Sequence, residues 1–305
     1  MTAPTFHDGE TALQVRGGSR AQLAEAGPRV IRAFMPQQHR DFFAELPFVL
    51  AATLDDSGQP WASALAGPAG FMHSPQPDRL RIDALPPVHD PIAPLRAGAA
   101  IGLLGIQPHT GRRNRMNGRV VAVDGRGFEV QVGQSFGNCP KYIQPREPRH
   151  APAASLAPVP VPRRLARLDD PAQRLIAQAD TFFIASAHPQ AANDDAPPAF
   201  GIDVSHRGGP PGFVGLAGDD ALVVPDYIGN SFFNTLGNLQ LEPRCGLLFI
   251  DFERGDLLQV AARAAVEWDG PQLAATSGAQ RLLRLQVLEA VAVPAALPLR
   301  WSPAR

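Results

Sequence analysis

The sequence contains only two cysteines, Cys139 and Cys245, and neither belongs to a Cys-x-x-Cys pair. So few cysteines exclude a framework of disulfides and argue against a zinc site. Lys and Arg together number 28 against 29 Asp and Glu, and no long basic run occurs. Because proteins that bind nucleic acids normally carry a basic surface, this balance argues against a nucleic-acid partner.

Long apolar segments are missing as well. No stretch approaches the roughly 18 uninterrupted apolar residues of a membrane span, and residues 1–20 lack the apolar core of a signal peptide. We therefore expect a cytoplasmic protein without a membrane partner. The 305 residues are 45% hydrophobic and 19% charged, which is typical of a globular protein large enough for two domains.

The two halves of the chain resemble each other, which indicates an internal duplication. Phe48–Thr53 matches Phe182–Ala187, Gly67–Phe71 matches Gly209–Phe213, Ala100–Leu104 matches Arg244–Leu248, Gly118–Val121 matches Ala262–Ala265, and Gln131–Val132 matches Gln286–Val287. The second match also places Ser63 opposite Ser205. Each match is weak alone, but their common order makes the duplication a firm prediction.

Both halves have the same order of predicted elements. A short amphipathic helix (Gln38–Glu45; Pro171–Ala179) precedes an apolar strand and two further strands. A helical stretch follows, predicted at Asp90–Ala97 and Ser231–Leu239, then apolar strands at Ile101–Ile106 and Cys245–Ile250, then strands that begin near Met116 and Leu257. Short strands at regular spacing with few helices favour a closed or partly closed barrel.

We therefore predict a mainly β protein, in which two tandem barrels with short helices form a pseudo-dimer within one chain. The alternative is a duplication that only enlarges one core. The predicted domains are an N-terminal extension (1–37), the first barrel (38–146), a stiff linker rich in Pro and Ala (147–169) and the second barrel (170–305).

The densest polar constellation lies at Asp203–Val214. Alternate residues of a strand share a face, so Asp203, Ser205 and Arg207 are expected to point together. A guanidinium group suits a phosphate, and Gly208 and the glycine after it allow a ligand to approach the backbone. The corresponding residues of the first half are Trp61, Ser63 and Leu65, so the halves differ chemically.

A second constellation spans Val224–Asn238. A strand is expected to end at Pro225-Asp226, and a helix to begin near Asn230 or Ser231, whose side chains are good N-caps. The free N–H groups of such a helix attract anions, and two more polar side chains follow at Asn234 and Thr235. The alternative interpretation is an ordinary capped helix.

A third polar segment, Ser135–Arg146, follows the first barrel and contains Cys139, Lys141 and Tyr142. Its counterpart at Ala290–Trp301 has lost nearly every polar group. One site between the halves would explain why each half keeps a different polar segment. Cys139 is either a redox thiol or merely buried, and the basic stretch Gly111–Arg119 is predicted to be a solvated hairpin.

Taken together, SHRGGPPGF, PDYIGNSFFNTLGN with EPRCGLLFIDF, GDLLQVAAR and FGNCPKYIQPR resemble predicted flavin-nucleotide-binding proteins of the pyridoxamine 5′-phosphate oxidase-like group. The resemblance covers about Gln38 to Trp301. It implies two split barrels with FMN in a groove between them. Carried over by position, it implies that Ser205, His206, Arg207 and Gly208 lie along the flavin, that Asn230, Ser231, Asn234 and Thr235 surround the phosphate, and that Lys141 and Tyr142 cover the isoalloxazine ring.

The resemblance implies an FMN-dependent oxidoreductase with an unidentified small-molecule substrate. Some relatives continue into a ferredoxin-reductase-like module, so a separate reductase is an expected electron donor, and two pseudo-dimers could associate further. No catalytic acid or base and no metal site can be named from the sequence. The alternatives are a non-catalytic flavin-binding module that relays electrons, a barrel that binds or degrades haem with His89, His188 or His206 as axial ligand, and a purely structural barrel.

Overall fold

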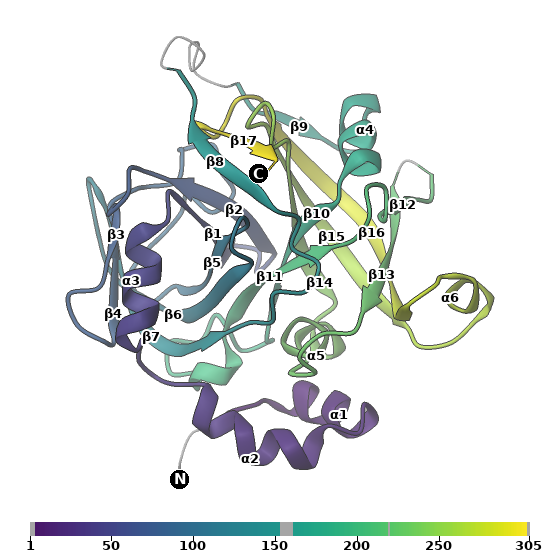
Figure 1. Ribbon diagram of the computed structural model, residues 1–305, viewed down its shortest axis with the longest axis horizontal. Coiled ribbons are helices and arrows are strands. Elements are labelled where there is room, and N and C mark those ends of the chain that lie inside the picture. Colours follow the sequence, from purple (N-terminus) through teal and green to yellow (C-terminus); the bar gives the residue numbers. More distant parts are fainter. Residues whose placement is uncertain (1–3, 153–160, 219, 304–305) are drawn as a thin grey trace.

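The computed structural model describes residues 4–152, 161–218 and 220–303 and consists of two barrels packed side by side (Figure 1). The first barrel is formed by one sheet of the strand order β2-β1-β5-β6-β7-β4-β3. Its strands are β1 (Phe48–Leu54), β2 (Pro60–Ala66), β3 (Met72–His73), β4 (Arg79–Ile82), β5 (Ala100–Gln107), β6 (Arg112–Asp124) and β7 (Gly127–Gly137). All neighbouring strands pair antiparallel.

The second barrel repeats this order strand for strand, as β11-β10-β14-β15-β16-β13-β12. Its strands are β10 (Thr181–Ala187), β11 (Ile202–Gly208), β12 (Gly215–Leu216), β13 (Ala221–Tyr227), β14 (Arg244–Ile250), β15 (Leu257–Glu267) and β16 (Ala279–Val293). The identical order confirms that the chain is mainly β and holds two tandem split barrels.

The strand pairing corrects one detail of the predicted repeat. Ala52 pairs with Gly102 in the first barrel, and Ala185 pairs with Gly246 in the second. Phe48–Leu54 is therefore equivalent to Thr181–Ala187, one residue earlier than the match of sequence letters. The sequence match is one residue out of register because both strands are apolar on both faces, so the sequence does not show which residues face the barrel interior. A shift of one residue exchanges the two faces of a strand.

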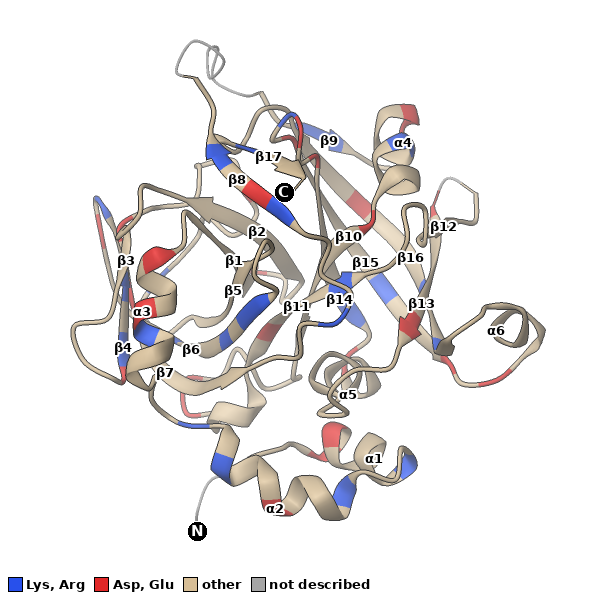
Figure 2. Ribbon diagram, viewed as in Figure 1, with Lys and Arg blue, Asp and Glu red and all other residues tan. Residues whose placement is uncertain are grey.

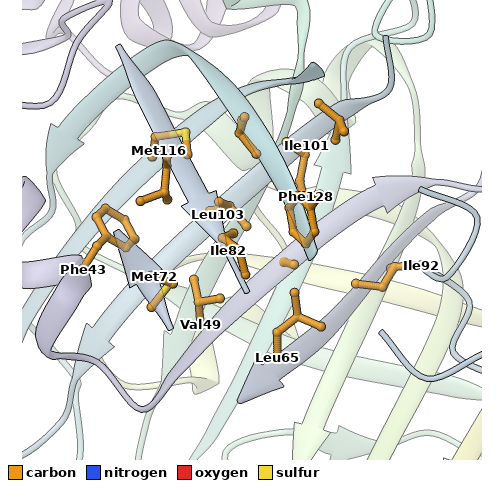
Figure 3. Packing of buried hydrophobic residues seen from close by; sticks show 14 of the residues in the cluster. Phe43, Val49, Leu65, Met72, Ile82, Ile92, Ile101, Leu103, Met116 and Phe128 are labelled. Atoms are coloured by element: carbon orange, nitrogen blue, oxygen red, sulfur yellow. The ribbon is translucent and has the colours of Figure 1, made fainter. Parts of the chain in front are cut away.

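The two faces of β1 contribute to different hydrophobic cores. Val49 and Ala51 point into the first barrel, where Figure 3 shows Val49 packed among aliphatic and aromatic side chains such as Leu103 and Phe128. Leu50 and Ala52 point the other way, into a separate core shared by the two barrels. The second barrel has an interior core of its own. The three cores explain why β1 and β10 are buried on both faces.

The shared core has the two-fold character of a dimer interface. Gly102 of β5 lies so close to β11 that an added Cβ would be 2.7 Å from Ile202 O. The equivalent Gly246 of β14 lies equally close to β2, with an added Cβ 2.4 Å from Pro60 O. The glycine of each barrel thus packs against the equivalent strand of the other barrel, as in an isologous contact. The pseudo-dimer is therefore a structural fact.

Two helices precede the barrels as predicted, α3 (Gln37–Glu45) and α4 (Asp170–Gln178), but the prediction at Asp90–Ala97 is wrong. Pro91 and Pro94 remove two backbone donors there and prevent a helix. The second barrel does have a helix at this point, α5 (Asn234–Leu241). Three smaller elements complete it: α6 (Pro271–Ala275), a 3₁₀ turn at Pro198–Phe200, and β9 (Arg163–Leu165), which pairs with β16.

The predicted N-terminal extension contains α1 (Asp8–Arg16) and α2 (Arg20–Val30), which lie beneath α5 at the lower edge of Figure 1. The predicted linker, 147–169, begins within β8 (Arg146–His150), which pairs with β17 (Leu299–Pro303) at the opposite end of the molecule. Residues 153–160 of the linker lie outside the described residues. Helix α1 of the extension packs on α5 of the second barrel, whereas Arg32 pairs with Ser135 and Met35 packs into the core of the first barrel.

We expect Gly102→Ala and Gly246→Ala each to lower the free energy of unfolding by about 1–3 kcal/mol, because the new methyl group would force the two backbones apart. Urea unfolding measures this difference. Gly125→Ala is the matched control, since an added Cβ there meets nothing within 4 Å. Equal stability of all three variants would contradict the close approach of the barrels.

Candidate functional site

A pocket lies between the two barrels, and its wall comes from β6 of the first barrel and from β11, β13, α5 and β16 of the second. Polar and basic side chains dominate this wall. Seven of the ten side chains predicted to form the site line it, namely Ser205, His206, Arg207, Asn230, Ser231, Asn234 and Thr235. Segments that are far apart in the sequence are thus brought together here.

Four arginines line this inter-barrel pocket: Arg113, Arg115, Arg207 and Arg281. The first two belong to Gly111–Arg119, whose interpretation as a solvated hairpin is wrong. Arg115 is only 3% exposed, and Arg113 is half-buried. The alternation of β6 turns these two side chains toward the second barrel, and Figure 2 shows basic and acidic positions close together where β6 meets β11. The charge pattern of the sequence does not indicate that Arg113 and Arg115 face the second barrel.

Arg115 is the centre of a buried polar network. Its Nη1 donates to Asp203 Oδ2 and to Asn234 Oδ1, each at 2.9 Å, and its Nη2 donates to Ser205 Oγ. Thr235 Oγ1 also donates to Ser205 Oγ, at 2.8 Å. Burial raises the pKa of Asp203, while Arg115 opposes that rise. Asp203 and Ser205 share a face as expected, and both are bound by a residue from the other barrel.

Arg207 and Arg281 share one carboxylate, since Asp226 accepts from Arg207 Nη1 and forms an ion pair with Arg281 Nε at 3.5 Å. Arg281 Nη1, Arg207 Nε and Arg115 Nε are buried and have no hydrogen-bond partner among the described residues. Buried donors without acceptors are costly, so they favour an anion in the pocket. The four guanidinium groups outnumber the carboxylates Asp203 and Asp226, which leaves the pocket positively charged.

The turn before α5 differs from its prediction. The helix begins at Asn234, not near Asn230 or Ser231, and its N-cap Phe233 makes no side-chain cap bond. Ser231 and Phe233 have φ values of 60° and 63°, a left-handed conformation that reverses the chain before the helix can start. Because no side chain caps α5, the free N–H groups of its first turn remain available to an anion at the pocket wall.

The other three predicted residues, Lys141, Tyr142 and Gly208, line a smaller pocket that adjoins the first. Both pockets share Arg113, His206, Arg207, Tyr227 and Gly229. Tyr142 stacks on Tyr227 with ring centroids 5.3 Å apart, so the tail of the first barrel covers the edge of the second. Cys139 is half-buried and lines the main pocket, whereas burial raises the pKa of Cys245 to about 12.

Of the three candidate haem ligands, His89, His188 and His206, only His206 lines the inter-barrel pocket. Its Nδ1 accepts from Arg113 Nη1 at 2.9 Å. Burial, reinforced by Arg113 and Arg207, holds the pKa of His206 well below its usual value, so the ring is neutral at neutral pH.

A second pocket occupies the place related to the first by the pseudo-two-fold axis. The strand pairing makes Leu257 and Gln259 equivalent to Arg113 and Arg115, and Leu65 equivalent to Arg207. Ser63 donates to Asp90 there, and Gln259 Nε2 donates to the same carboxyl group at 3.1 Å. The hydroxyl group of Ser63 thus contacts a carboxyl group where that of Ser205 contacts a guanidinium group, and the lining of the second pocket holds no arginine.

None of the helices in the described ranges has the length and apolar character that crossing a membrane requires. The same ranges hold no group of three or more His, Cys, Asp and Glu side chains placed to bind a metal ion.

The family comparison agrees with the strand order. Residues 35–157, which span the whole first barrel, match the family model for pyridoxamine 5′-phosphate oxidase. Over this whole range the first barrel is similar to that family. This match confirms the resemblance inferred from the motifs. No curated protein matches the chain.

Solved structures with a similar fold each cover about one barrel. A pyridoxamine 5′-phosphate oxidase candidate from Lactobacillus delbrueckii is 15% identical and covers 41% of this chain and 93% of its own, with a TM-score of 0.32. An FMN-binding protein from Syntrophomonas wolfei is 11% identical (39% and 80% covered, TM-score 0.28). The heme storage protein HutZ from Vibrio cholerae is 14% identical (42% and 95% covered, TM-score 0.29). These likenesses add nothing to the strand order described above.

We expect Arg115→Met to destabilise the protein by about 3–5 kcal/mol, because it leaves the Asp203 carboxylate buried without its partner. The double variant Arg115→Met/Asp203→Leu should recover much of that loss, which denaturant unfolding of the two single variants and the double variant measures. Strictly additive effects would show that the two side chains do not interact.

Proposed function

We propose that the protein binds FMN in the inter-barrel pocket and acts as a flavin-dependent oxidoreductase on a small-molecule substrate. The observation that best supports this function is the set of buried guanidinium N–H groups without acceptors on Arg115, Arg207 and Arg281. A phosphate dianion supplies several acceptor oxygens at once and balances the excess positive charge. The uncapped N-terminus of α5 adds backbone donors on the same wall.

The residues present fit a flavin phosphate in both charge and geometry. Arg207 and Arg281 would hold the phosphate from the second barrel, and Thr235 and the first turn of α5 would donate to it. Tyr142, stacked on Tyr227 beside Lys141, would cover the ring system. When bound, FMN supplies a redox centre that accepts and releases a hydride or single electrons.

A module that relays electrons without turning over a substrate is a second candidate. His206 is the histidine at the pocket wall, and it is neutral and engaged by Arg113, so it is poorly placed to donate a proton. A separate reductase would then be the electron donor, and no turnover with small-molecule acceptors is expected.

The absorbance spectrum of freshly purified protein, repeated after incubation with FMN and desalting, tests the proposal. We expect a flavin spectrum that Arg207→Ala weakens, with an FMN affinity lower by about 10- to 100-fold, because a charge-assisted hydrogen bond contributes roughly 1.5–3 kcal/mol. Arg126→Ala, an exposed arginine of the first barrel, is the control and should bind as the parent does. No flavin in any sample would refute the proposal, and a Soret band would point to haem.

We expect one FMN per chain, since the pseudo-equivalent pocket has Leu65, Leu257 and Gln259 where the first has arginines. Equilibrium dialysis at saturating FMN measures the ratio. A ratio of two would show that the arginines do not determine which pocket is used.

Riboflavin should bind at least tenfold more weakly than FMN, because it lacks the phosphate.

A further inference from the structure

The N-terminal extension brings a carboxyl group to the back of the inter-barrel pocket. Glu10 of α1 is only 4% exposed, and its Oε1 accepts from Asn234 Nδ2 on α5. Its Oε2 accepts from His7 N at 2.9 Å. Helices α1 and α5 cross without any intervening side chain, since a Cβ added to Gly9 would lie 2.2 Å from Gly237 O. The carboxyl group is thus fixed by the fold.

Asn234 connects this carboxyl group to the pocket wall. Its Nδ2 faces Glu10 and its Oδ1 accepts from Arg115 Nη1, so a flipped amide would set its NH₂ group against the guanidinium group. Glu10 therefore fixes the orientation of a side chain that lines the pocket. Through Asn234 it also influences Arg115 and the Ser205 hydroxyl group that Arg115 holds.

We propose that Glu10 is a positioning residue of the anion site, and that a dianionic ligand binds with the Glu10 carboxyl group protonated, so that binding takes up a proton from solution. This inference rests on the proposed binding of FMN in the same pocket. The only chemical change is the transfer of one proton from solvent to a carboxylate oxygen.

The burial of Glu10 favours the neutral acid. Burial raises the pKa of Glu10 to about 8, and Asp203 adds to the rise, while Arg115 and the hydrogen bonds from His7 and Asn234 oppose it. A dianion on the other side of Asn234 disfavours the ionised form further. The charged or titratable groups that face Glu10 are His7 of α1, Asp203 of β11 and Arg115 of β6, and His188 after β10 packs against His7.

The neighbouring imidazoles do not compete for this proton near pH 8. Burial lowers the pKa of His7 to about 4, and burial also lowers the pKa of His188. His7 Nδ1 accepts from Gly9 N, which places the ring proton on Nε2, 3.6 Å from Glu10 Oε2. Both rings are therefore neutral when Glu10 titrates.

Isothermal titration calorimetry of the full chain with FMN tests the proposal directly. Titrations at pH 7 and pH 9, in phosphate-free buffers of different ionisation enthalpy, give the protons taken up per FMN. We expect less than about 0.2 proton at pH 7 and nearly one at pH 9, with a dissociation constant that rises by up to about tenfold per pH unit above pH 8.

Glu10→Gln, or Glu10→Met if the first does not fold, should abolish the uptake and make the affinity independent of pH over this range. Glu242→Gln is the matched control, because Arg244 holds the pKa of Glu242 below its usual value and this carboxylate stays ionised. FMN binding without uptake in the parent protein, or uptake that persists without Glu10, would overturn the inference alone. No FMN binding at either pH would overturn both this inference and the proposed function.

Discussion

The contact on which the site depends is the buried guanidinium group of Arg115. It extends from the first barrel and binds Asp203 and Ser205 of the second, and through Asn234 it reaches the N-terminal extension. A charge at this depth needs close pairing, which Nη1 and Nη2 have and Nε does not. The same contact therefore fixes the register of the two barrels and arranges the polar wall of the pocket. Stability and ligand binding cannot be separated at this residue.

The pseudo-two-fold axis relates two pockets with opposite chemistry. Where one has Arg115 and Asp203, the other has Gln259 and Trp61, and the backbone contacts around them remain equivalent. The interface between the barrels has been kept, while the side chains at one pocket have become largely apolar. Packing at an interface constrains backbone distance far more strictly than it constrains the side chains at its edges.

Much of the fold could be predicted from the sequence, because periodicity and repeated order are local signals. The tandem barrels, α3 and α4 were predicted correctly, and seven of the ten predicted site residues line one pocket. The one-residue slip in the first strand could not be detected, since both faces of that strand are apolar. The roles of Arg113, Arg115 and Glu10 depend on which distant segments meet, and no local pattern of the chain encodes that. The helix predicted at Asp90–Ala97 is the avoidable error, because Pro91 and Pro94 are visible in the sequence.

Joining both barrels in one chain has a consequence for how such a site can diverge. In a homodimer, each substitution appears in both copies, so an arginine lost from one pocket is lost from its twin. In this chain, Leu65 and Arg207 occupy equivalent positions of the two barrels, and either can be substituted without a change in the other. The association of the barrels is also intramolecular, so dilution cannot separate them, and the site between them is complete at any protein concentration.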